Sequence, residues 1–243
     1  MSLLSDLKVL YQMTLKPIRG QDHAARLESF YAGQADAYDE FRRRLLQGRG
    51  EVWAALSVPE QGVWVDMGGG TGANLEYFGD RIRKLKKVYL VDLSPSLLQV
   101  AARRVQAHGW TNVETREADA TTFQPAGEIV DVVTFSYSLT MIPDWYAALD
   151  NARSMLHPGG SIGVVDFYVA RKYPPDGLRR HSWFTRTFWP IWFAGDNVFP
   201  SSDHVPYLHR HFDPLHFEEH RARIPYLPFV RAPYYTFVGR KRT

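Results

Sequence analysis

Two short apolar segments constrain the fold of this chain more than any other feature. Residues 63–72 read VWVDMGGGTG, and a second apolar run, residues 88–91, ends at Asp92. The first run is short and β-branched, which is typical of a buried parallel strand, and the glycines end it abruptly. Asp92, at the tip of the next strand, is placed to accept hydrogen bonds from the two hydroxyls of a ribose. The pair predicts a nucleoside-containing cofactor.

The glycine segment alone leaves two cofactor classes open. Residues 68–73 also fit the G-x-G-x-x-A fingerprint of dinucleotide-binding proteins. Asp66 favours the other class, because a carboxylate beside a pyrophosphate would repel it. S-adenosylmethionine has a ribose for Asp92, a cationic ammonium for the Asp66 side and no phosphate. The pattern D-x-G-x-G-x-G followed by an acidic strand end resembles the class I methyltransferases.

Composition limits the remaining possibilities. The 243 residues fit one α/β domain with an elaboration, and we expect neither a membrane span nor a signal peptide. The absence of cysteine excludes disulfides and thiolate metal sites and is compatible with the cytosol. Residues 1–167 carry 17 basic and 20 acidic side chains, whereas residues 168–243 carry 12 and 6. This basic, aromatic C-terminal part could meet nucleic acid or an anionic membrane.

From residue 62 onward, strand and helix signals alternate. This rhythm predicts an α/β fold of Rossmann-like type, with a mostly parallel sheet and helices on both faces. Two further strands resemble the closing antiparallel hairpin of the seven-stranded methyltransferase sheet. The expected strands are 63–66, 88–92, 113–116, 129–135, 161–167, 215–224 and 234–239, and the expected helices are 73–84, 94–108 and 144–156.

The same signals divide the chain into four regions built around one core. They are an N-terminal helical cap (1–50), a cofactor-binding core (51–167), an aromatic and basic insertion (168–212) and closing strands of the same core (213–243). Residues 183–193 are aromatic all round, which fits a substrate lid, a lipid-facing surface or a helix buried on the sheet. A loop-like stretch follows Gly195. An apolar stripe in residues 2–16 fits a membrane-surface helix or a helix packed on the domain.

The strand ends assign the cofactor contacts, since ligands of open α/β sheets lie over the carboxyl ends of the strands. Asp119 is expected to accept from the adenine amino group, or else to cap a helix. Ser136 and Tyr137 are expected beside the transferring methyl group, or else as a packed strand end. The full predicted set here is Asp66, Gly68, Gly70 and Gly72 at the methionine part, Asp92 and Leu93 at the ribose, Asp119 and Ala120 at the adenine, and Ser136 and Tyr137 at the methyl group.

A helical face ahead of the glycine segment is expected to close over the cofactor. It carries Tyr31, Gln34, Tyr38 and Arg42. Tyr38 would lie on the sulfonium side and Arg42 on the methionine carboxylate. The alternative is a solvated helix with two tyrosines in the core. Five C-terminal histidines match no ligand spacing, so we expect no metal site.

Several segments together resemble one family, the methyltransferase module of betaine-lipid synthases. These segments are 30–39, 64–72, 88–97, 136–144 and 163–169, with 188–193, 207–208 and 233–239 nearer the C-terminus. The family converts diacylglycerylhomoserine to diacylglyceryl-trimethylhomoserine. The resemblance covers most of the chain after about residue 28. Fused enzymes of this family also carry a module that makes the homoserine headgroup, and 243 residues have no room for it.

The resemblance implies an N-methyltransferase that uses S-adenosylmethionine, releases S-adenosylhomocysteine and depends on a separate headgroup-transferring enzyme. It also implies a cytoplasmic protein, peripheral at the inner face of the membrane. No nucleic-acid partner is expected, because the basic tail is interleaved with a bulky apolar cluster and has no stripe of lysines. Tyr31, Tyr38 and Tyr137 are the expected catalytic wall for the growing ammonium. Solvent or a tyrosine hydroxyl could serve as base. The expected substrate contacts are Tyr31, Gln34, Arg179, Arg180 and His181.

Three other functions remain open at this point. The same fold could methylate phosphatidylethanolamine or a quinone ring carbon. The chain could also be a non-catalytic, cofactor-binding protein that associates with membranes.

Overall fold

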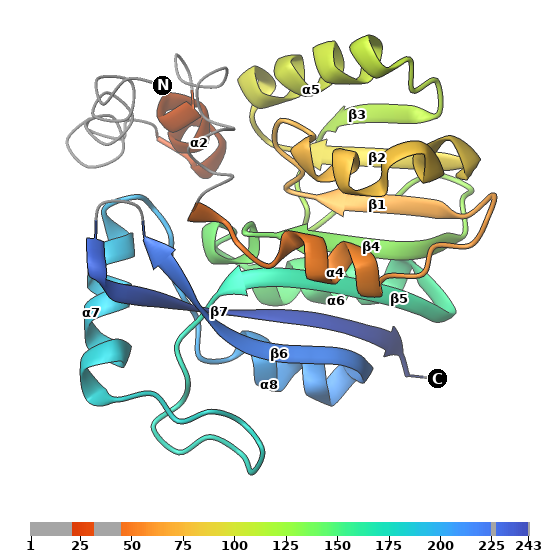
Figure 1. Cartoon of the computed structure of the whole chain (residues 1–243). Helices are drawn as coiled ribbons and strands as arrows, with labels where there is room; N and C mark the ends of the chain where they lie inside the picture. The colour runs from red at the N-terminus through yellow and green to blue at the C-terminus, as the bar shows by residue number, and fades with distance from the viewer. Residues whose placement is uncertain (1–20, 32–44, 225–226, 243) are drawn as a thin grey trace.

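A computed structural model describes residues 21–31, 45–224 and 227–242 of the chain. Its centre is a seven-stranded sheet of order β3-β2-β1-β4-β5-β7-β6 (Figure 1). The five strands from β3 to β5 run parallel, whereas β7 is antiparallel to both β5 and β6. The strands are β1 (Val63–Met67), β2 (Lys87–Asp92), β3 (Val113–Glu117), β4 (Val130–Ser136), β5 (Leu156–Phe167), β6 (Phe212–Ile224) and β7 (Leu227–Lys241). The predicted fold class is confirmed.

Two sets of helices cover the two faces of this sheet. One apolar cluster joins the sheet to α4 (Arg49–Ala55), η1 (Ala73–Lys84), α5 (Pro95–His108) and α7 (Trp183–Ala194). A second cluster joins the opposite face to α6 (Trp145–Met155) and α8 (His204–His211). All five residues of β1 are buried, as expected for a central parallel strand covered on both sides.

Local sequence signals explain where the elements begin and end. The Ser94 hydroxyl accepts a hydrogen bond from the Leu97 amide at 3.4 Å, and Pro95 is the first residue of α5. Gly109 ends α5 in the left-handed region, with φ of 61°. These signals place α5 directly after β2, so its N-terminus faces the carboxyl edge of the sheet.

The structure departs from the sequence-based expectation in three places. Residues 204–211 form α8, although a loop was expected there; Pro206 falls in the first turn, where a missing N–H breaks no helical bond. The 73–84 helix is of the 3₁₀ type and is interrupted at Gly79, with φ of 54° and ψ of −137°. β5 starts at Leu156 rather than residue 161, because Leu156 pairs with Val130 across an irregularity in the register.

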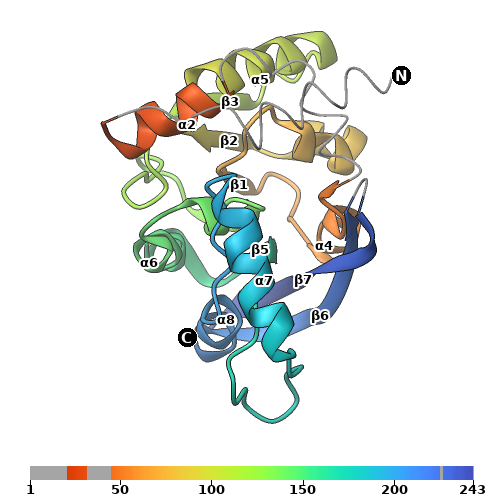
Figure 2. The ribbon, with the colours of Figure 1, turned by 90° about the vertical axis from the view of Figure 1, so that its left-hand side faces the viewer.

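The carboxyl edge of the parallel strands carries two further helices. Figure 2 looks onto this edge, with α7 running across it and α2 (His23–Tyr31) near its top. Residues 168–212, the expected insertion, contribute α7 and α8 to the two faces of the sheet. None of the helices in the described ranges is long and apolar enough to cross a membrane.

Candidate active site

The glycine loop after β1 brings bare backbone to the carboxyl edge. Gly68, Gly70 and Gly72 all have positive φ angles, of 65°, 57° and 73°. A Cβ atom added at Gly68 would lie 2.4 Å from the Cβ of Ser138. Glycine is therefore required at Gly68 both for its conformation and for space. Gly68 and Gly70 line a cavity of about 280 Å³, whereas Gly72 shapes the turn beneath it.

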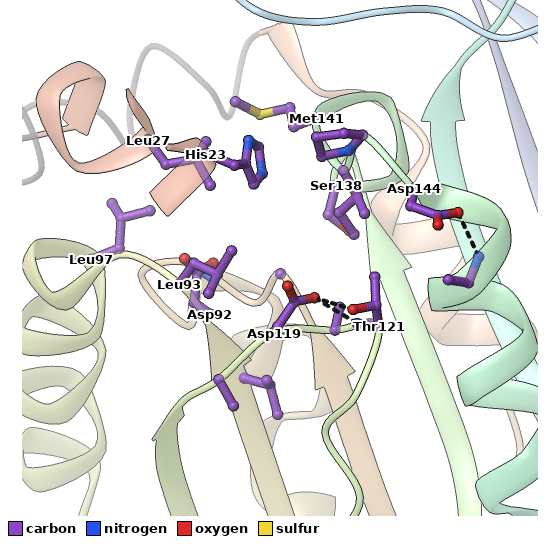
Figure 3. A pocket seen from close by; sticks show the side chains of 18 of the residues that line it. His23, Leu27, Asp92, Leu93, Leu97, Asp119, Thr121, Ser138, Met141 and Asp144 are labelled. Carbon is purple, nitrogen blue, oxygen red and sulfur yellow. Dashed lines mark hydrogen bonds between the residues drawn. The ribbon is translucent and has the colours of Figure 1, made fainter. Parts of the chain in front are cut away.

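Asp92 is fixed at the end of β2 by backbone donors. One carboxylate oxygen accepts from the Gly70 amide and the other from the Ser94 amide, both at 2.9 Å. The side chain faces the cavity beside Leu93 (Figure 3). The predicted placement fits a ribose, whose two hydroxyls would donate to an oriented carboxylate.

The adenine end of the predicted site lies after β3. Asp119 Oδ1 accepts from the amide and the hydroxyl of Thr121, each at 2.7 Å. Asp119 is exposed into the cavity and Ala120 lines the same wall (Figure 3). Asp119 thus caps a turn through Oδ1, and its contact with adenine stays a prediction.

Helix α2 covers the cavity from the side opposite these strand ends. His23 and Leu27 project from α2 toward Asp119 and Asp92 (Figure 3). Burial lowers the pKa of His23, and Arg26 lowers it further, so its imidazole is neutral near pH 7. A neutral ring and a leucine form a suitable cover for a purine. Sequence reasoning expected a helical face beginning at Tyr31 to close over the cofactor, but it did not identify His23 or Leu27.

Glu28 attaches α2 to the start of α5. Its carboxylate accepts from the Ser94 hydroxyl at 2.7 Å, from the Ser96 amide at 3.3 Å and from the Ser96 hydroxyl. Desolvation raises the pKa of Glu28, but the hydrogen bonds from Ser96 and Ser94 outweigh it and leave the pKa below its ordinary value. The charged form is thus the one that holds α2 in place.

The rim opposite α2 is formed by η2 (Leu139–Met141) and the residues that follow it. Met141 and Ile142 line the cavity, together with Ser138, whose hydroxyl donates to the Met67 carbonyl at 2.9 Å. Sequence reasoning assigned no role to Ser138, Met141 or Ile142, although all three lie in segment 136–144, which carries part of the family resemblance. Their apolar side chains can exclude water from a bound cofactor.

Asp66 lies beneath the glycine loop and does not line the cavity. Its side chain is fully buried and accepts from the Thr134 hydroxyl at 2.6 Å and from the Asn74 amide at 3.0 Å. Burial raises the pKa of Asp66 to about 6, against the lowering effect of those two hydrogen bonds. It remains ionised at neutral pH, and its negative charge under the loop disfavours a pyrophosphate and favours a cationic group above.

Two predicted contacts beside the methyl group need correction. The Ser136 hydroxyl accepts from Arg49 Nε at 3.0 Å and lies outside the cavity lining. Tyr137 does line the cavity, but its hydroxyl donates to the Gln47 carbonyl at 2.7 Å. Burial raises the pKa of Tyr137 well above its ordinary value. Among the tyrosine hydroxyls that could serve as a base, that of Tyr137 is already engaged as a donor to the Gln47 carbonyl.

The Tyr137 ring has neighbours on more than one side. It packs against Phe167, with ring centroids 4.7 Å apart, and the Arg49 guanidinium lies 5.8 Å from its centroid. Tyr137 itself has a positive φ of 54°, an unusual conformation for a tyrosine. Its position at the cavity edge is held by strand pairing, since its amide donates to the Val165 carbonyl at 2.7 Å.

Three predicted substrate residues lie away from the cavity. None of Arg179, Arg180 and His181 contributes to its lining. His181 is buried, and its Nδ1 accepts from the Ala170 amide at 3.0 Å. Burial, followed by the charges of nearby arginines, lowers the pKa of His181 to about 4. A buried ring with a lowered pKa, outside the cavity lining, does not offer the positive charge that a substrate carboxylate would need, and the roles of Arg179 and Arg180 stay predictions.

The remaining predicted positions fall where the structure gives no side-chain description. Gln34, Tyr38 and Arg42 lie outside the described residues, as does the apolar stripe of residues 2–16. Tyr31 ends α2, but its side chain is also outside the description. Their expected roles stay predictions.

The described residues bring together one group with potential metal ligands. Glu51, Glu218 and His220 have ligand atoms within 4.8 Å of one another. His220 Nε2 lies 3.1 Å from Glu51 and 3.6 Å from Glu218, which an ion pair at a half-exposed surface explains. This group joins α4 to β6 and takes no part in lining the cavity.

Comparison with known proteins agrees with this geometry. Residues 65–160 match the family model of a methyltransferase domain. A ubiquinone/menaquinone biosynthesis C-methyltransferase UbiE of Hahella chejuensis is 27% identical over 153 residues, which are 60% of this chain and 60% of that relative. The aligned part therefore spans less than two thirds of the relative's length.

Solved structures share the fold at low identity. A putative methyltransferase of Bacillus halodurans superposes with a TM-score of 0.64 at 16% identity, covering 81% of this chain and 99% of that one. A phosphoethanolamine N-methyltransferase of Haemonchus contortus superposes with a TM-score of 0.64 at 15% identity, covering 88% of this chain and 59% of that one. The fold, the domain match and the oriented Asp92 together identify S-adenosylmethionine as the cofactor.

Proposed function

We propose that this chain, an S-adenosylmethionine-dependent methyltransferase with the class I fold, methylates the amine of diacylglycerylhomoserine three times. The product is the betaine lipid diacylglyceryl-trimethylhomoserine. The position of α7 is the observation that supports a lipid substrate. This helix runs across the carboxyl edge of the sheet, where the cofactor cavity also lies (Figure 2), and it has large exposed aromatic residues. The resemblance of segments 30–39, 136–144 and 163–169 to betaine-lipid enzymes selects the homoserine amine among lipid substrates.

The residues of the site supply what this reaction requires. The bound cofactor provides an electrophilic methyl group on a sulfonium. Asp92 and Asp119 would hold the nucleoside, and the missing side chain at Gly68 lets Ser138 pack directly against the glycine loop that the methionine part would meet. His23 and Leu27 cover the nucleoside and exclude water.

Proton handling is simple for this substrate. The amine must be neutral to attack, so the proton of its ammonium form passes to solvent before each round. Its lone pair would then take the methyl group as the carbon–sulfur bond breaks, and S-adenosylhomocysteine would leave before the next round. This fits a site in which the Tyr137 hydroxyl is committed to the Gln47 carbonyl. The same proposal places the protein at the inner face of the membrane, where a separate enzyme supplies the homoserine lipid.

Methylation of a quinone ring carbon is the second candidate, supported by the names of relatives such as the Hahella chejuensis protein. Methylation of phosphatidylethanolamine is a third, chemically closer to the first because it also ends in a quaternary ammonium. All three acceptors are lipids, so the position of α7 does not separate them.

Product masses separate these candidates. The purified chain is incubated with S-adenosylmethionine and, in separate reactions, with each lipid dispersed in detergent. We expect one, two and three added methyl groups on diacylglycerylhomoserine, and no product from Asp92→Ala under the same conditions. Methylation of only the quinone or only phosphatidylethanolamine would overturn the assignment. Tight cofactor binding without transfer to any lipid would instead point to a non-catalytic role.

A further inference from the structure

Helix α7 has one face in the core and another that is open to solvent. Trp189 and Phe193 are buried, and the Phe193 ring stacks on Phe167 with centroids 4.6 Å apart. The opposite side, here called the α7 outer face, consists of Trp183, Phe184, Ile191 and Trp192, which are 72%, 54%, 72% and 41% exposed. Monomeric soluble proteins rarely gather so many large apolar side chains in one place without a binding role.

The segment that leads into α7 is rich in positive charge. Residues 171–194 contain five basic side chains and one acidic side chain. Arg179 and Arg186 both lower the pKa of the buried His181, which places them around the N-terminal end of α7. Lys172 and Arg180 are exposed on the preceding loop. An anionic bilayer offers the complementary charge, and tryptophans are favoured at its interface.

The α7 outer face is also connected to the rim of the cofactor cavity. After α7, the Val198 amide donates to the Phe193 carbonyl at 3.1 Å, and the next amide, that of Phe199, donates to the Thr140 carbonyl at 2.7 Å. Thr140 belongs to η2, whose neighbour Met141 lines the cavity. A surface bound to α7 therefore lies beside the rim through which a lipid headgroup would enter.

We propose that α7 is the membrane-docking element of this protein, with its outer face inserted at the interface of an anionic lipid bilayer. This inference rests on the proposed function, because a membrane lipid that serves as substrate must reach the cavity from the bilayer. The aromatic residues supply apolar insertion, and the exposed Lys172 and Arg180 supply attraction to anionic headgroups. A protein bound through the α7 outer face has the carboxyl edge of its sheet turned toward the bilayer.

The chain offers a matched pair of variants for the test. Ile191 is 72% exposed on the α7 outer face and Ile129 is 71% exposed just ahead of β4. Binding of the full chain to phosphatidylglycerol-containing vesicles and to pure phosphatidylcholine vesicles is measured by cosedimentation, with no cofactor present. We expect the wild type to prefer the anionic vesicles by about tenfold or more, and added salt to remove this preference.

Each variant has a defined outcome. Phe184→Ser combined with Ile191→Ser should weaken vesicle binding by about tenfold or more, while Ile129→Ser stays within about twofold of the wild type. Equal binding by the wild type, the double variant and Ile129→Ser would overturn the inference. Loss of self-association in the double variant, measured by sedimentation velocity, with unchanged vesicle binding would make the α7 outer face an interface between copies of the chain and would also overturn it.

The docking inference and the proposed function can fail separately. Vesicle binding is measured without methyl transfer, and methyl transfer is measured on detergent-dispersed lipid without vesicles. Normal vesicle binding with no methylation of the homoserine lipid would remove the proposed function alone. Normal methylation in detergent with no α7-dependent binding would remove the docking role alone.

Discussion

The Asp92 carboxylate accepts a hydrogen bond from the Gly70 amide at 2.9 Å, so the acidic end of β2 and the glycine loop after β1 fix each other's position. The glycine loop and the end of β2 thereby form one binding surface, although η1 separates them in the sequence. The nucleoside acceptor and the bare backbone that approaches the methionine part cannot shift independently.

We predict that Asp92→Ala weakens binding of S-adenosylhomocysteine by at least about tenfold, because hydrogen bonds to a charged group contribute roughly 1.5–3 kcal/mol each. Isothermal titration calorimetry measures the affinity. Asp80→Ala, at an exposed position in η1, is the matched control and should bind like the wild type. Unchanged affinity in Asp92→Ala would remove Asp92 from the ribose site.

Gly68→Ala should destabilise the protein more than Gly127→Ala does. Both glycines have positive φ, of 65° and 71°, so both substitutions cost about 1 kcal/mol of backbone strain. Only the Cβ at Gly68 would meet another atom, that of Ser138 at 2.4 Å, whereas nothing lies within 4 Å at Gly127. Denaturant titrations should show the larger loss at Gly68, with partial rescue by Ser138→Gly. Equal losses would contradict the close approach.

Asp166 should make stability depend on pH. Burial raises its pKa to about 7, although hydrogen bonds from Thr140 and Phe167 oppose this shift. Between about pH 4 and pH 7, the unfolded chain has lost this proton and the folded chain retains it. The folded state then binds more protons, so this group lowers the free energy of unfolding as pH rises.

The comparison with Asp166→Asn isolates that effect, because asparagine does not titrate. As pH rises from about 5 to about 7, we expect the wild type to lose stability relative to the variant by on the order of 1 kcal/mol per pH unit. Parallel profiles for the two proteins would show that Asp166 is ionised throughout this range.

Two tryptophans of α7 should respond differently to truncation. Trp189 is 2% exposed and stacks on Phe193, with ring centroids 5.4 Å apart, whereas Trp192 is on the α7 outer face. Trp189→Ala should cost about 3–5 kcal/mol, and Trp192→Ala less than about 1 kcal/mol. Urea denaturation followed by circular dichroism measures both. A large loss in Trp192→Ala would mean that the α7 outer face supports the fold rather than a ligand.

The strands and the cofactor end of the site could be predicted because their signals are local. A short apolar run, a glycine turn and an acidic strand end fix where Asp92 lies, whatever the rest of the chain does. The residues around α5 likewise specify their own helix ends through Ser94, Pro95 and Gly109. Parallel pairing then brings the strand ends to one edge without further information.

Side-chain partners far apart in sequence could not be predicted in this way. Ser136 is 87 residues from Arg49, the donor that engages it, and Tyr137 is 90 residues from the carbonyl that binds its hydroxyl. His181 has charged neighbours in sequence, but its ring is buried against Tyr168, with centroids 4.9 Å apart. The sequence pattern predicts at which edge of the sheet a residue lies. It does not predict which of its side-chain atoms form hydrogen bonds with distant parts of the chain.

We propose that the methyl acceptor is the amine of a homoserine lipid. The most direct measurement is a single reaction that contains diacylglycerylhomoserine, phosphatidylethanolamine and a demethylated quinone at equal concentration, with S-adenosylmethionine carrying an isotopically labelled methyl group. Tandem mass spectrometry of the products locates the label. We predict that it accumulates in the trimethylhomoserine headgroup; label found mainly on the quinone ring or on the ethanolamine headgroup would contradict the account.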